Sequence, residues 1–234
     1  SPSMSLLRST FAVGLLTLLS RALGLIRDVV FASVFGAGGA TDAFLVAFKI
    51  PNFMRRLFAE GAFSQAFVPV LGEYRKKHGE ARTQALVSAV SGSLGLVLLG
   101  VTAVGILAAG AFVWLFAPGF AQDSARFDLT VEMLRITFPY LFFISLAALG
   151  AGVLNTYGRF GIPAFTPVLL NIALITAAYL SPWFAQPIMA LAWGVLLAGL
   201  LQYAFQLPAL YQIRMLTLPR PNFADPGVRQ IFKL

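Results

Sequence analysis

The stretch Leu6–Phe35, LLRSTFAVGLLTLLSRALGLIRDVVFASVF, decides the fold class. A helix needs about 20 predominantly apolar residues to cross the roughly 30 Å hydrocarbon core of a bilayer. This stretch exceeds that length, and its only charged residues are Arg8, Arg21, Arg27 and Asp28. It therefore predicts a long membrane-spanning helix.

Five further apolar stretches follow, and composition supports the same fold class. They are Ala43–Leu71, Leu86–Phe116, Leu129–Tyr157, Pro163–Leu180 and Pro187–Tyr211. Hydrophobic residues make up 59% of the 234 and charged residues 11%, whereas soluble domains carry about 25% charged residues. The chain is predicted to be an all-α polytopic membrane protein with six transmembrane helices. Its charge of +8 does not indicate nucleic-acid binding, which needs a basic face on a soluble fold.

Lysine and arginine residues predict the orientation in the membrane. With the N-terminus inside, the outer loops hold only Arg126, while the inner segments hold Arg8, Arg75, Lys76, Lys77, Arg82, Arg159, Arg214, Arg220, Arg229 and Lys233. Cytoplasmic loops of membrane proteins are enriched in these residues. Both termini are therefore expected in the cytoplasm.

The chain divides into three parts. Residues 1–3, before Met4, read as a cloning remnant, and residues 4–211 form the six-helix lobe. Residues 212–234 are polar and broken by prolines, and they predict a cytoplasmic amphipathic linker in which Val228–Leu234 starts another helix. Within the third span, small residues such as Ser88 and Gly92 are expected to allow close helix packing.

The first span carries a polar, cationic face. At about 100° per residue, an arc of roughly 140° holds Gly14, Thr17, Ser20, Arg21, Gly24, Arg27 and Asp28. Charges at membrane depth cost about 2.5–3.5 kcal/mol each on insertion scales, so this face must line protein or water. Asp28 is a candidate partner for Arg21. Alternatively, Arg27 and Asp28 lie at the outer interface, where their side chains extend to water.

The second span contains Lys49-Ile50-Pro51-Asn52-Phe53-Met54-Arg55-Arg56 near its middle. Pro51 lacks a backbone donor, which predicts a break at Pro51-Asn52 that turns Arg55 inward toward Arg21 and Arg27. Helical spacing places Lys49, Asn52, Arg56 and Glu60 on one side of the helix, and Arg55 on the side nearer to Phe48. The same spacing allows Arg56 and Glu60 to pair. Alternatively, the span ends at Arg55-Arg56, and Leu57–Leu71 lies along the membrane surface. In the fourth span Pro139 is expected to produce a kink.

The intramembrane charges indicate an anionic ligand. Arg21, Arg27, Lys49, Arg55 and Arg56 face only Asp28 and Glu60, which leaves an excess of cations. Guanidinium groups bind phosphate oxygens in bidentate geometry, so a diphosphate fits such a cavity. Gly24 and Pro51 are expected as hinge positions. The sequence has no metal-ligand cluster, nucleophile motif or phosphate-binding glycine loop, so it predicts a transporter without a metal or cofactor, not an enzyme.

Several motifs together resemble one known family. They are Ser20-Arg21-x-Leu23-Gly24-x-x-Arg27-Asp28, Phe35-Gly36-Ala37-Gly38-x-x-Thr41-Asp42-Ala43-Phe44, Pro51-Asn52-x-x-Arg55-Arg56-x-Phe58-Ala59-Glu60-Gly61, Thr137-Phe138-Pro139-Tyr140 and Arg159-Phe160-x-Ile162-Pro163. The chain is similar in these motifs, over essentially all of Met4–Leu234, to the MurJ (MviN) lipid II flippases. That family belongs to the multidrug/oligosaccharidyl-lipid/polysaccharide exporter superfamily.

The resemblance implies a multi-pass protein of the bacterial inner membrane that flips lipid II, the undecaprenyl-diphosphate-linked peptidoglycan precursor, to the outer leaflet. It implies that Arg21, Arg27 and Arg55 bind the diphosphate in a central cavity and that Asp42 lies near the outer gate. Positions matching Ser20, Asn52, Arg56 and Glu60 are functionally sensitive in the family. It also implies alternating access between two lobes, of which this chain holds the first, so the missing C-terminal lobe is an expected partner.

Two other functions are compatible with the same residues. One is a flippase for another polyprenyl-linked oligosaccharide, which would share the cationic cavity. The other is a non-transporting membrane scaffold for cell-wall enzymes, in which the buried cations would be structural.

Overall fold

The computed structural model describes residues 2–60 and 62–233, apart from the side chains of Pro2, Ala59, Glu60 and Ala62. Within these residues the regular structure is helical. The elements are α1 (Pro2–Phe35), α2 (Gly39–Arg55), the π-helical turn η1 (Arg56–Glu60), α3 (Ala62–Lys77), α4 (Gly79–Leu107), α5 (Ala109–Phe116), the 3-10 turn η2 (Pro118–Gln122), α6 (Ser124–Thr137), α7 (Tyr140–Thr156), α8 (Gly161–Leu180), the 3-10 turn η3 (Ser181–Trp183), α9 (Met189–Gln212) and α10 (Pro226–Phe232).

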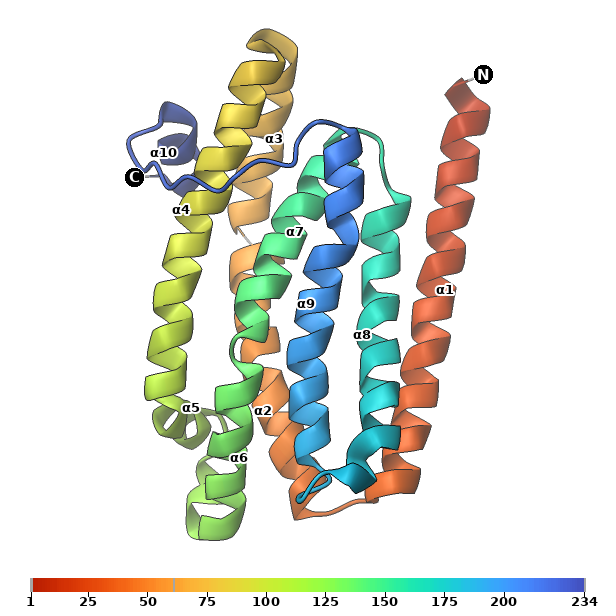
Figure 1. Cartoon of the computed structure of the whole chain (residues 1–234), viewed down its shortest axis with the longest axis vertical. Helices are drawn as coiled ribbons and strands as arrows, with labels where there is room; N and C mark the ends of the chain where they lie inside the picture. Colours follow the sequence, from red (N-terminus) through yellow and green to blue (C-terminus); the bar gives the residue numbers. More distant parts are fainter. Residues whose placement is uncertain (1, 61, 234) are drawn as a thin grey trace.

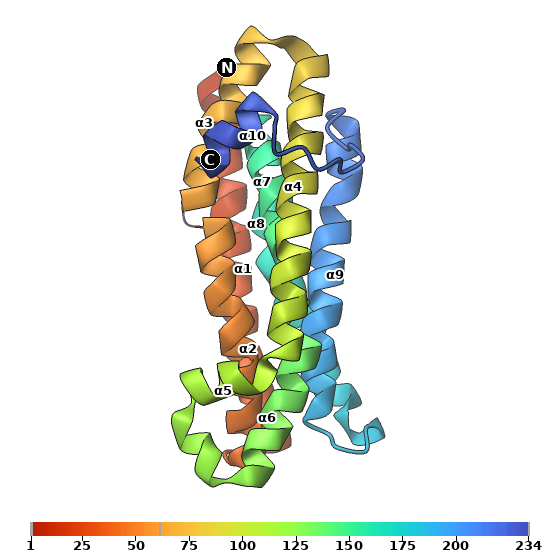
Figure 2. The same ribbon diagram turned by 90° about the vertical axis from the view of Figure 1, so that its left-hand side faces the viewer.

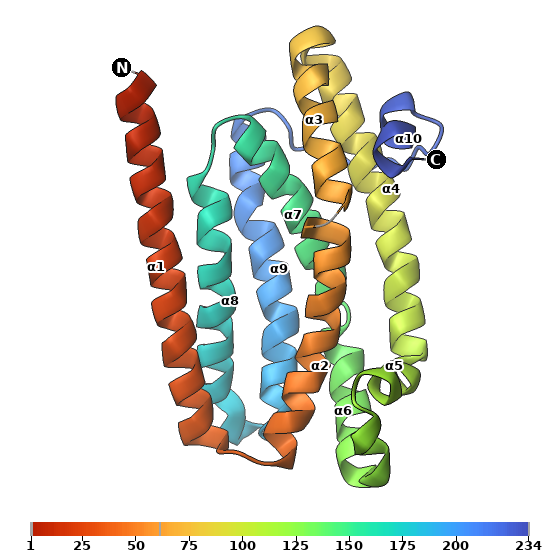
Figure 3. The same ribbon diagram turned by 180° about the vertical axis from the view of Figure 1, so that it is seen from behind.

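The helices run roughly parallel to one long axis and form a bundle (Figure 1). In the described part of the chain, five segments are long and apolar enough to cross a membrane: Ser3–Phe35, Gly79–Leu107, Ser124–Thr156, Gly161–Trp183 and Met189–Gln212. The second predicted span is not among them because it is divided into α2, η1 and α3. However, α3 continues in the direction of α2 instead of lying across the bundle (Figure 3). The prediction of an all-α polytopic membrane protein is confirmed.

Both described ends of the chain lie at the same end of the bundle (Figure 1). The turn between α3 and α4 and the loop between α7 and α8 lie at this end too, whereas the loop between α1 and α2 lies at the other (Figures 1 and 3). These are the segments in which the sequence concentrates lysine and arginine. The basic segments are therefore gathered at one end of the molecule.

The expected break at Pro51-Asn52 is wrong. α2 continues through Pro51 to Arg55, and the change of helical geometry comes in the following residues, Arg56–Glu60. Proline leaves the carbonyl four residues earlier without its helical donor, here that of Ala47. The buried Thr137 hydroxyl of α6 donates to this Ala47 carbonyl oxygen over 2.6 Å. A side chain from a neighbouring helix thus replaces the missing donor, and the helix stays regular.

The expected kink at Pro139 is confirmed, because α6 ends at Thr137 and α7 begins at Tyr140. Next to it, Phe138 is fully buried, and its ring packs so closely on Gly105 of α4 that there is no room for a Cβ atom. The glycine in α4 thus allows the close helix contact that the small residues of this span predicted.

Residues 213–225, here called the strap, cross the outside of α4 (Figure 2). The Arg220 amide donates to the Ser88 carbonyl over 3.0 Å, and the Asn222 amide donates to Ser93 Oγ over 3.0 Å. The strap backbone lies against Gly92. Ser88 and Gly92 were expected to pack against another helix. They contact an extended segment instead, because a surface of small residues admits a backbone this closely.

The strap ends in α10, which packs on α3 and α4. Asp225 caps α10 by accepting from the amides of Gly227 and Val228, and the ring of Phe232 lies 5.4 Å from that of Phe63 in α3. The prediction of a new helix near Val228 is confirmed for the described residues, and Leu234 lies outside them. The strap and α10 occupy the edge of the bundle opposite α1 (Figures 1 and 3).

Candidate functional site

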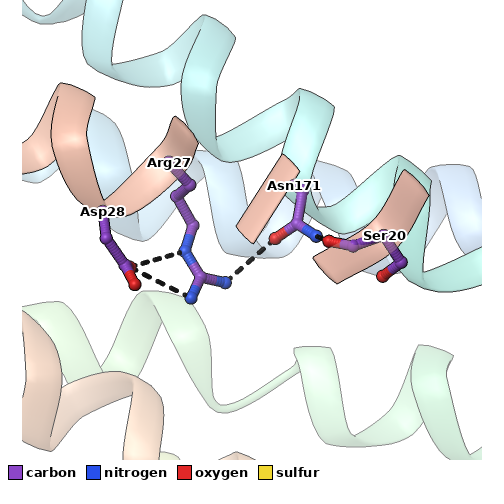
Figure 4. A network of polar contacts seen from close by, with 4 residues as sticks. All are labelled: Ser20, Arg27, Asp28 and Asn171. Atoms are coloured by element: carbon purple, nitrogen blue, oxygen red, sulfur yellow. Dashed lines mark hydrogen bonds and ion pairs between the residues drawn. The ribbon is translucent and has the colours of Figure 1, made fainter. Parts of the chain in front are cut away.

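Arg27 lies in a polar network that joins α1 to α8 (Figure 4). Its Nη1 donates to Asn171 Oδ1 over 2.9 Å, while its Nε and Nη2 donate to Asp28 Oδ1 over 3.3 and 3.2 Å. In turn, Asn171 Nδ2 donates to the backbone carbonyl of Ser20 over 3.0 Å. Asn171 is buried at 6% exposure. The orientation of the Arg27 guanidinium is therefore fixed from both α1 and α8.

The two helices approach each other closely at Gly24, where a Cβ atom would lie 4.0 Å from Asn171 Nδ2. Gly24 was expected as a hinge, but α1 runs without interruption from Pro2 to Phe35 in this structure. Gly24 faces Asn171, and a Cβ atom there would lie at an ordinary van der Waals distance from the Asn171 amide. The hinge role of Gly24 stays a prediction.

Arg55 lines a cavity of about 420 Å³ between α2, α7, α8 and α9. Its Nε donates to Asn52 Oδ1 over 3.0 Å, and both side chains are half-buried. The other walls are formed by Tyr140, Ile144, Ala147, Ala148, Ala151, Pro163, Thr166, Pro167, Leu170 and Gln202. The alanines of α7 leave the space open, and the amide, phenol and guanidinium groups give it polar walls.

The two parts of the site meet at α8. Leu170 lines the Arg55 cavity, and the next residue, Asn171, holds Arg27. At 1.5 Å per residue, Arg21 lies about 21 Å along α1 from Phe35, and Arg55 lies about 24 Å along α2 from Gly39. Both helices leave the same short loop, so Arg21 and Arg55 lie at similar depth in the bundle, with Arg27 about 12 Å from that loop.

The candidate pairing of Arg21 with Asp28 is wrong. Asp28 pairs with its neighbour Arg27, because adjacent side chains at the end of the polar face reach each other without crossing a helical turn. Arg55 bonds to Asn52, since side chains three residues apart on a helix are neighbours.

The remaining predicted site residues are mostly exposed. Arg21, Lys49, Arg56 and Asp42 are exposed, Ser20 is half-buried, and Pro51 is buried against the core. No hydrogen bond or ion pair joins Arg21 to another residue in the described part of the chain. The Glu60 side chain, and with it the expected Arg56–Glu60 pair, lies outside the described residues. The alternative in which Arg27 and Asp28 only extend to water does not account for the bond from Arg27 to Asn171.

Sequence reasoning missed the residues that α7, α8 and α9 contribute, above all Asn171, Tyr140 and Gln202. An asparagine inside the apolar stretch Pro163–Leu180 and a glutamine inside Pro187–Tyr211 are the signals that were available, because polar side chains at membrane depth need partners.

Comparison with known proteins identifies the family of the chain. The family model described as lipid II flippase MurJ matches residues 31–234. The chain is 48% identical to a probable lipid II flippase MurJ of Vibrio cholerae, over 98% of this chain and 45% of that protein. It is also 48% identical to the lipid II flippase MurJ of Burkholderia cenocepacia, over 97% of this chain and 45% of that protein.

A solved structure described as lipid II flippase MurJ in an inward closed conformation superposes with a TM-score of 0.75 at 29% identity, over 94% of this chain and 46% of that one. The chain thus spans a little under half the length of these relatives. The family model over residues 31–234 and the 48% identity over nearly the whole chain show that the chain belongs to the MurJ family of lipid II flippases.

Proposed function

We propose that this chain forms the first lobe of a transporter that moves lipid II from the inner to the outer leaflet of the bacterial inner membrane. The proposal is supported by the bond from Arg27 to Asn171 of α8 and by the cavity that Arg55 lines together with Leu170, the residue before Asn171. Arg21, Arg27 and Arg55 together supply cationic donors to a diphosphate that crosses the bilayer. Because the relatives are about twice as long, a second lobe completes the cavity.

Asp28 controls the Arg27 guanidinium before the substrate arrives. Its carboxylate accepts from both Nε and Nη2 of Arg27, which is the edge that a phosphate would engage. The Asp28 side chain is 64% exposed, whereas that of Arg27 is 26% exposed. A phosphate therefore displaces a solvated carboxylate, while Asn171 keeps the guanidinium in place from the other side.

Arg21 differs from Arg27 because it is exposed and no described residue engages it. We expect it to make the first contact with the lipid phosphate, since it lies at similar depth to Arg55. Transfer to Arg27 then moves the diphosphate along α1 by about 9 Å toward the loop between α1 and α2. With both termini in the cytoplasm, as the lysine and arginine distribution predicts, that direction is outward.

Complementation of a depleted strain by the complete gene product tests this function. Arg21→Ala should abolish export of the precursor while the folded protein is still produced, and Arg21→Lys should restore it only in part, because an ammonium lacks the guanidinium fork. The control is Lys76→Ala, an exposed cation at the basic end of α3. Full export by Arg21→Leu would remove Arg21 from the proposal. Loss of a different surface glycan on depletion would favour another polyprenyl-linked substrate, and loss of complex assembly alone would favour a scaffold.

A further inference from the structure

The loop between α7 and α8 has a defined backbone geometry. The Gly158 amide donates to the Asn155 carbonyl over 3.0 Å, and the Arg159 amide donates to the Leu154 carbonyl over 2.8 Å. Gly158 has a φ of 76°, so the loop shows the two bonds and the left-handed glycine of a Schellman motif. These bonds pair two of the four carbonyls that the end of a helix leaves without an intrahelical donor.

A guanidinium from α3 pairs a third carbonyl at this helix end. Arg75 Nη1 donates to the carbonyl of Thr156, the last residue of α7, over 2.8 Å. The Cζ atom of Arg75 also lies 4.0 Å from the centre of the Tyr157 ring, within the range of cation–π contacts. A cation is favourable at this position, because the C-terminal end of a helix dipole is negative. Arg75, Thr156 and Tyr157 are here called the clasp.

The clasp joins two walls of the cavity that Arg55 lines. Arg55 is the last residue of α2, and η1 and α3 follow it in the chain. α7 forms another wall, which ends at Ala151. α3 packs against α7, and a Cβ atom at Gly152 would lie 3.6 Å from Val68 of α3. α3 therefore connects the arginine wall to the α7 wall, and the clasp fastens this connection where the basic segments gather (Figure 3).

The clasp can affect the cavity only through the backbone. Among the described residues, none of its three members lines the cavity. Without Arg75, the end of α7 would lose its link to α3, and the α7–α8 loop would gain freedom. A ligand that binds between α7 and α8 would then have to order this loop, and such ordering costs affinity.

We infer that Arg75 is a positioning residue for the diphosphate site: by capping α7 from α3, it holds the α7–α8 loop and the α7 wall in the arrangement that the lipid diphosphate needs at Arg55. The inference rests on the proposed function, since that function places the diphosphate at Arg55. Arg75 itself touches no part of the lipid, so the bond and the ring contact matter and its charge alone does not.

Lys76 supplies a matched control. It is the next residue of α3, carries the same charge and, like Arg75, is exposed. Arg75→Met and Lys76→Met therefore remove the same charge from the same end of α3, but only the first removes the clasp. Arg75→Lys keeps a cationic donor near Thr156 and Tyr157, so it serves as the conservative variant.

The first measurement is hydrogen exchange at the amides of Gly158 and Arg159, on the complete gene product in lipid nanodiscs. Arg75→Met should accelerate this exchange about tenfold, the effect of one hydrogen bond to a charged group. Lys76→Met should leave it unchanged, and Arg75→Lys should restore most of the protection. Equal exchange in the two methionine variants would overturn the inference.

The second measurement is the dissociation constant of undecaprenyl diphosphate on the same proteins. Arg75→Met should raise it by about 2- to 10-fold, the cost of ordering a released segment, while Lys76→Met should not change it. Arg75→Lys should bind nearly as well as the parent protein. A cap that only stabilises the fold would not alter the affinity of the folded protein, so faster exchange with unchanged affinity would also overturn the inference.

Arg55→Gln separates failure of the proposed function from failure of the inference. Unchanged binding of undecaprenyl diphosphate in Arg55→Gln would contradict the proposed diphosphate site. Weaker binding in Arg55→Gln together with unchanged binding in Arg75→Met would contradict the inference alone.

A second pair of variants applies if Arg75→Met does not fold. Tyr157→Leu removes the ring that faces the Arg75 guanidinium, whereas Tyr157→Phe keeps a ring there. Faster loop exchange and weaker binding in Tyr157→Leu than in Tyr157→Phe would support the inference, and equal values in the two variants would overturn it.

Discussion

Asn171 should hold α1 against the rest of the lobe. Among the described helices, α8 is the one that α1 packs along for most of its length (Figure 3), and Asn171 supplies two side-chain hydrogen bonds across that contact. We expect Asn171→Ala to release α1 locally, while the core formed by α4, α6 and α7 stays intact.

The magnitude follows from the two bonds. In water-soluble proteins a hydrogen bond to a charged group contributes about 1.5–3 kcal/mol and a neutral one about 0.5–1.5 kcal/mol. Between membrane helices the measured average is only about 0.6 kcal/mol per bond. The partly exposed Arg27 places the pair toward the lower values, so we expect a loss of about 1–2 kcal/mol for the two bonds together.

Hydrogen exchange of the α1 amides measures this loss directly, because local opening sets their protection. A loss of about 1.4 kcal/mol predicts about tenfold faster exchange in α1 with no change in α4. Asn171→Asp should retain the link to Arg27 and lose only the bond to the Ser20 carbonyl, and therefore give a smaller effect. The neighbouring Ile172, which is 45% exposed, supplies the control Ile172→Ala. Exchange in α1 that is equal in Asn171→Ala and Ile172→Ala would refute the reasoning.

Three further predictions concern other contacts. Thr137→Val should destabilise the lobe by about 1–3 kcal/mol because it leaves the Ala47 carbonyl unpaired. Adding Pro51→Ala should recover part of this loss, because residue 51 then has an amide that donates to this carbonyl. Thermal unfolding of the two single variants and of the double variant tests both expectations. Gly92→Ala should displace the strap, since a methyl group would overlap the backbone of Arg220 and Pro221. Chymotrypsin should then cleave faster after Phe223, whereas Gly95→Ala, which has open space, should not change the cleavage. Cysteines at Gly38 and Asp123 should react with an impermeant reagent added outside intact cells while one at Lys77 should not, and labelling at Lys77 would overturn the orientation.

The fold class could be predicted from the sequence because apolar length alone separates membrane spans from soluble helices. The comparison of Pro139 with Pro51 shows where this kind of prediction fails. At Pro139 the chain breaks as local chemistry predicts. At Pro51 the same chemistry is offset by the hydroxyl of Thr137, a residue 90 positions distant from the carbonyl that it reaches. Local rules cannot anticipate a donor that another helix supplies.

The residues of the candidate site could likewise be predicted only in part. The arginines of α1 and α2 are conspicuous in apolar stretches, so Arg27 and Arg55 could be singled out from sequence. The residues that contact Arg27 and Arg55 from other helices could not be predicted in this way. Asn171 is 144 residues from Arg27 along the chain, and Gln202 reaches the cavity from α9. Which side chains share a cavity depends on helix order and rotation, and the pattern within one helix does not encode these.

The strap has a consequence for synthesis of the protein. The Ser88 hydroxyl finds its acceptor, the Leu218 carbonyl, 130 residues later in the chain. At about 5–20 residues per second, the ribosome needs roughly 6–26 seconds to deliver that partner after Ser88 itself has been made. During this interval α4 is already in place with its groove of small residues empty. Nascent chains arrested just before residue 217 should therefore carry an α3–α4 hairpin that the strap does not yet cover. At this stage of assembly the uncovered face of α4 is accessible to a chaperone or a protease.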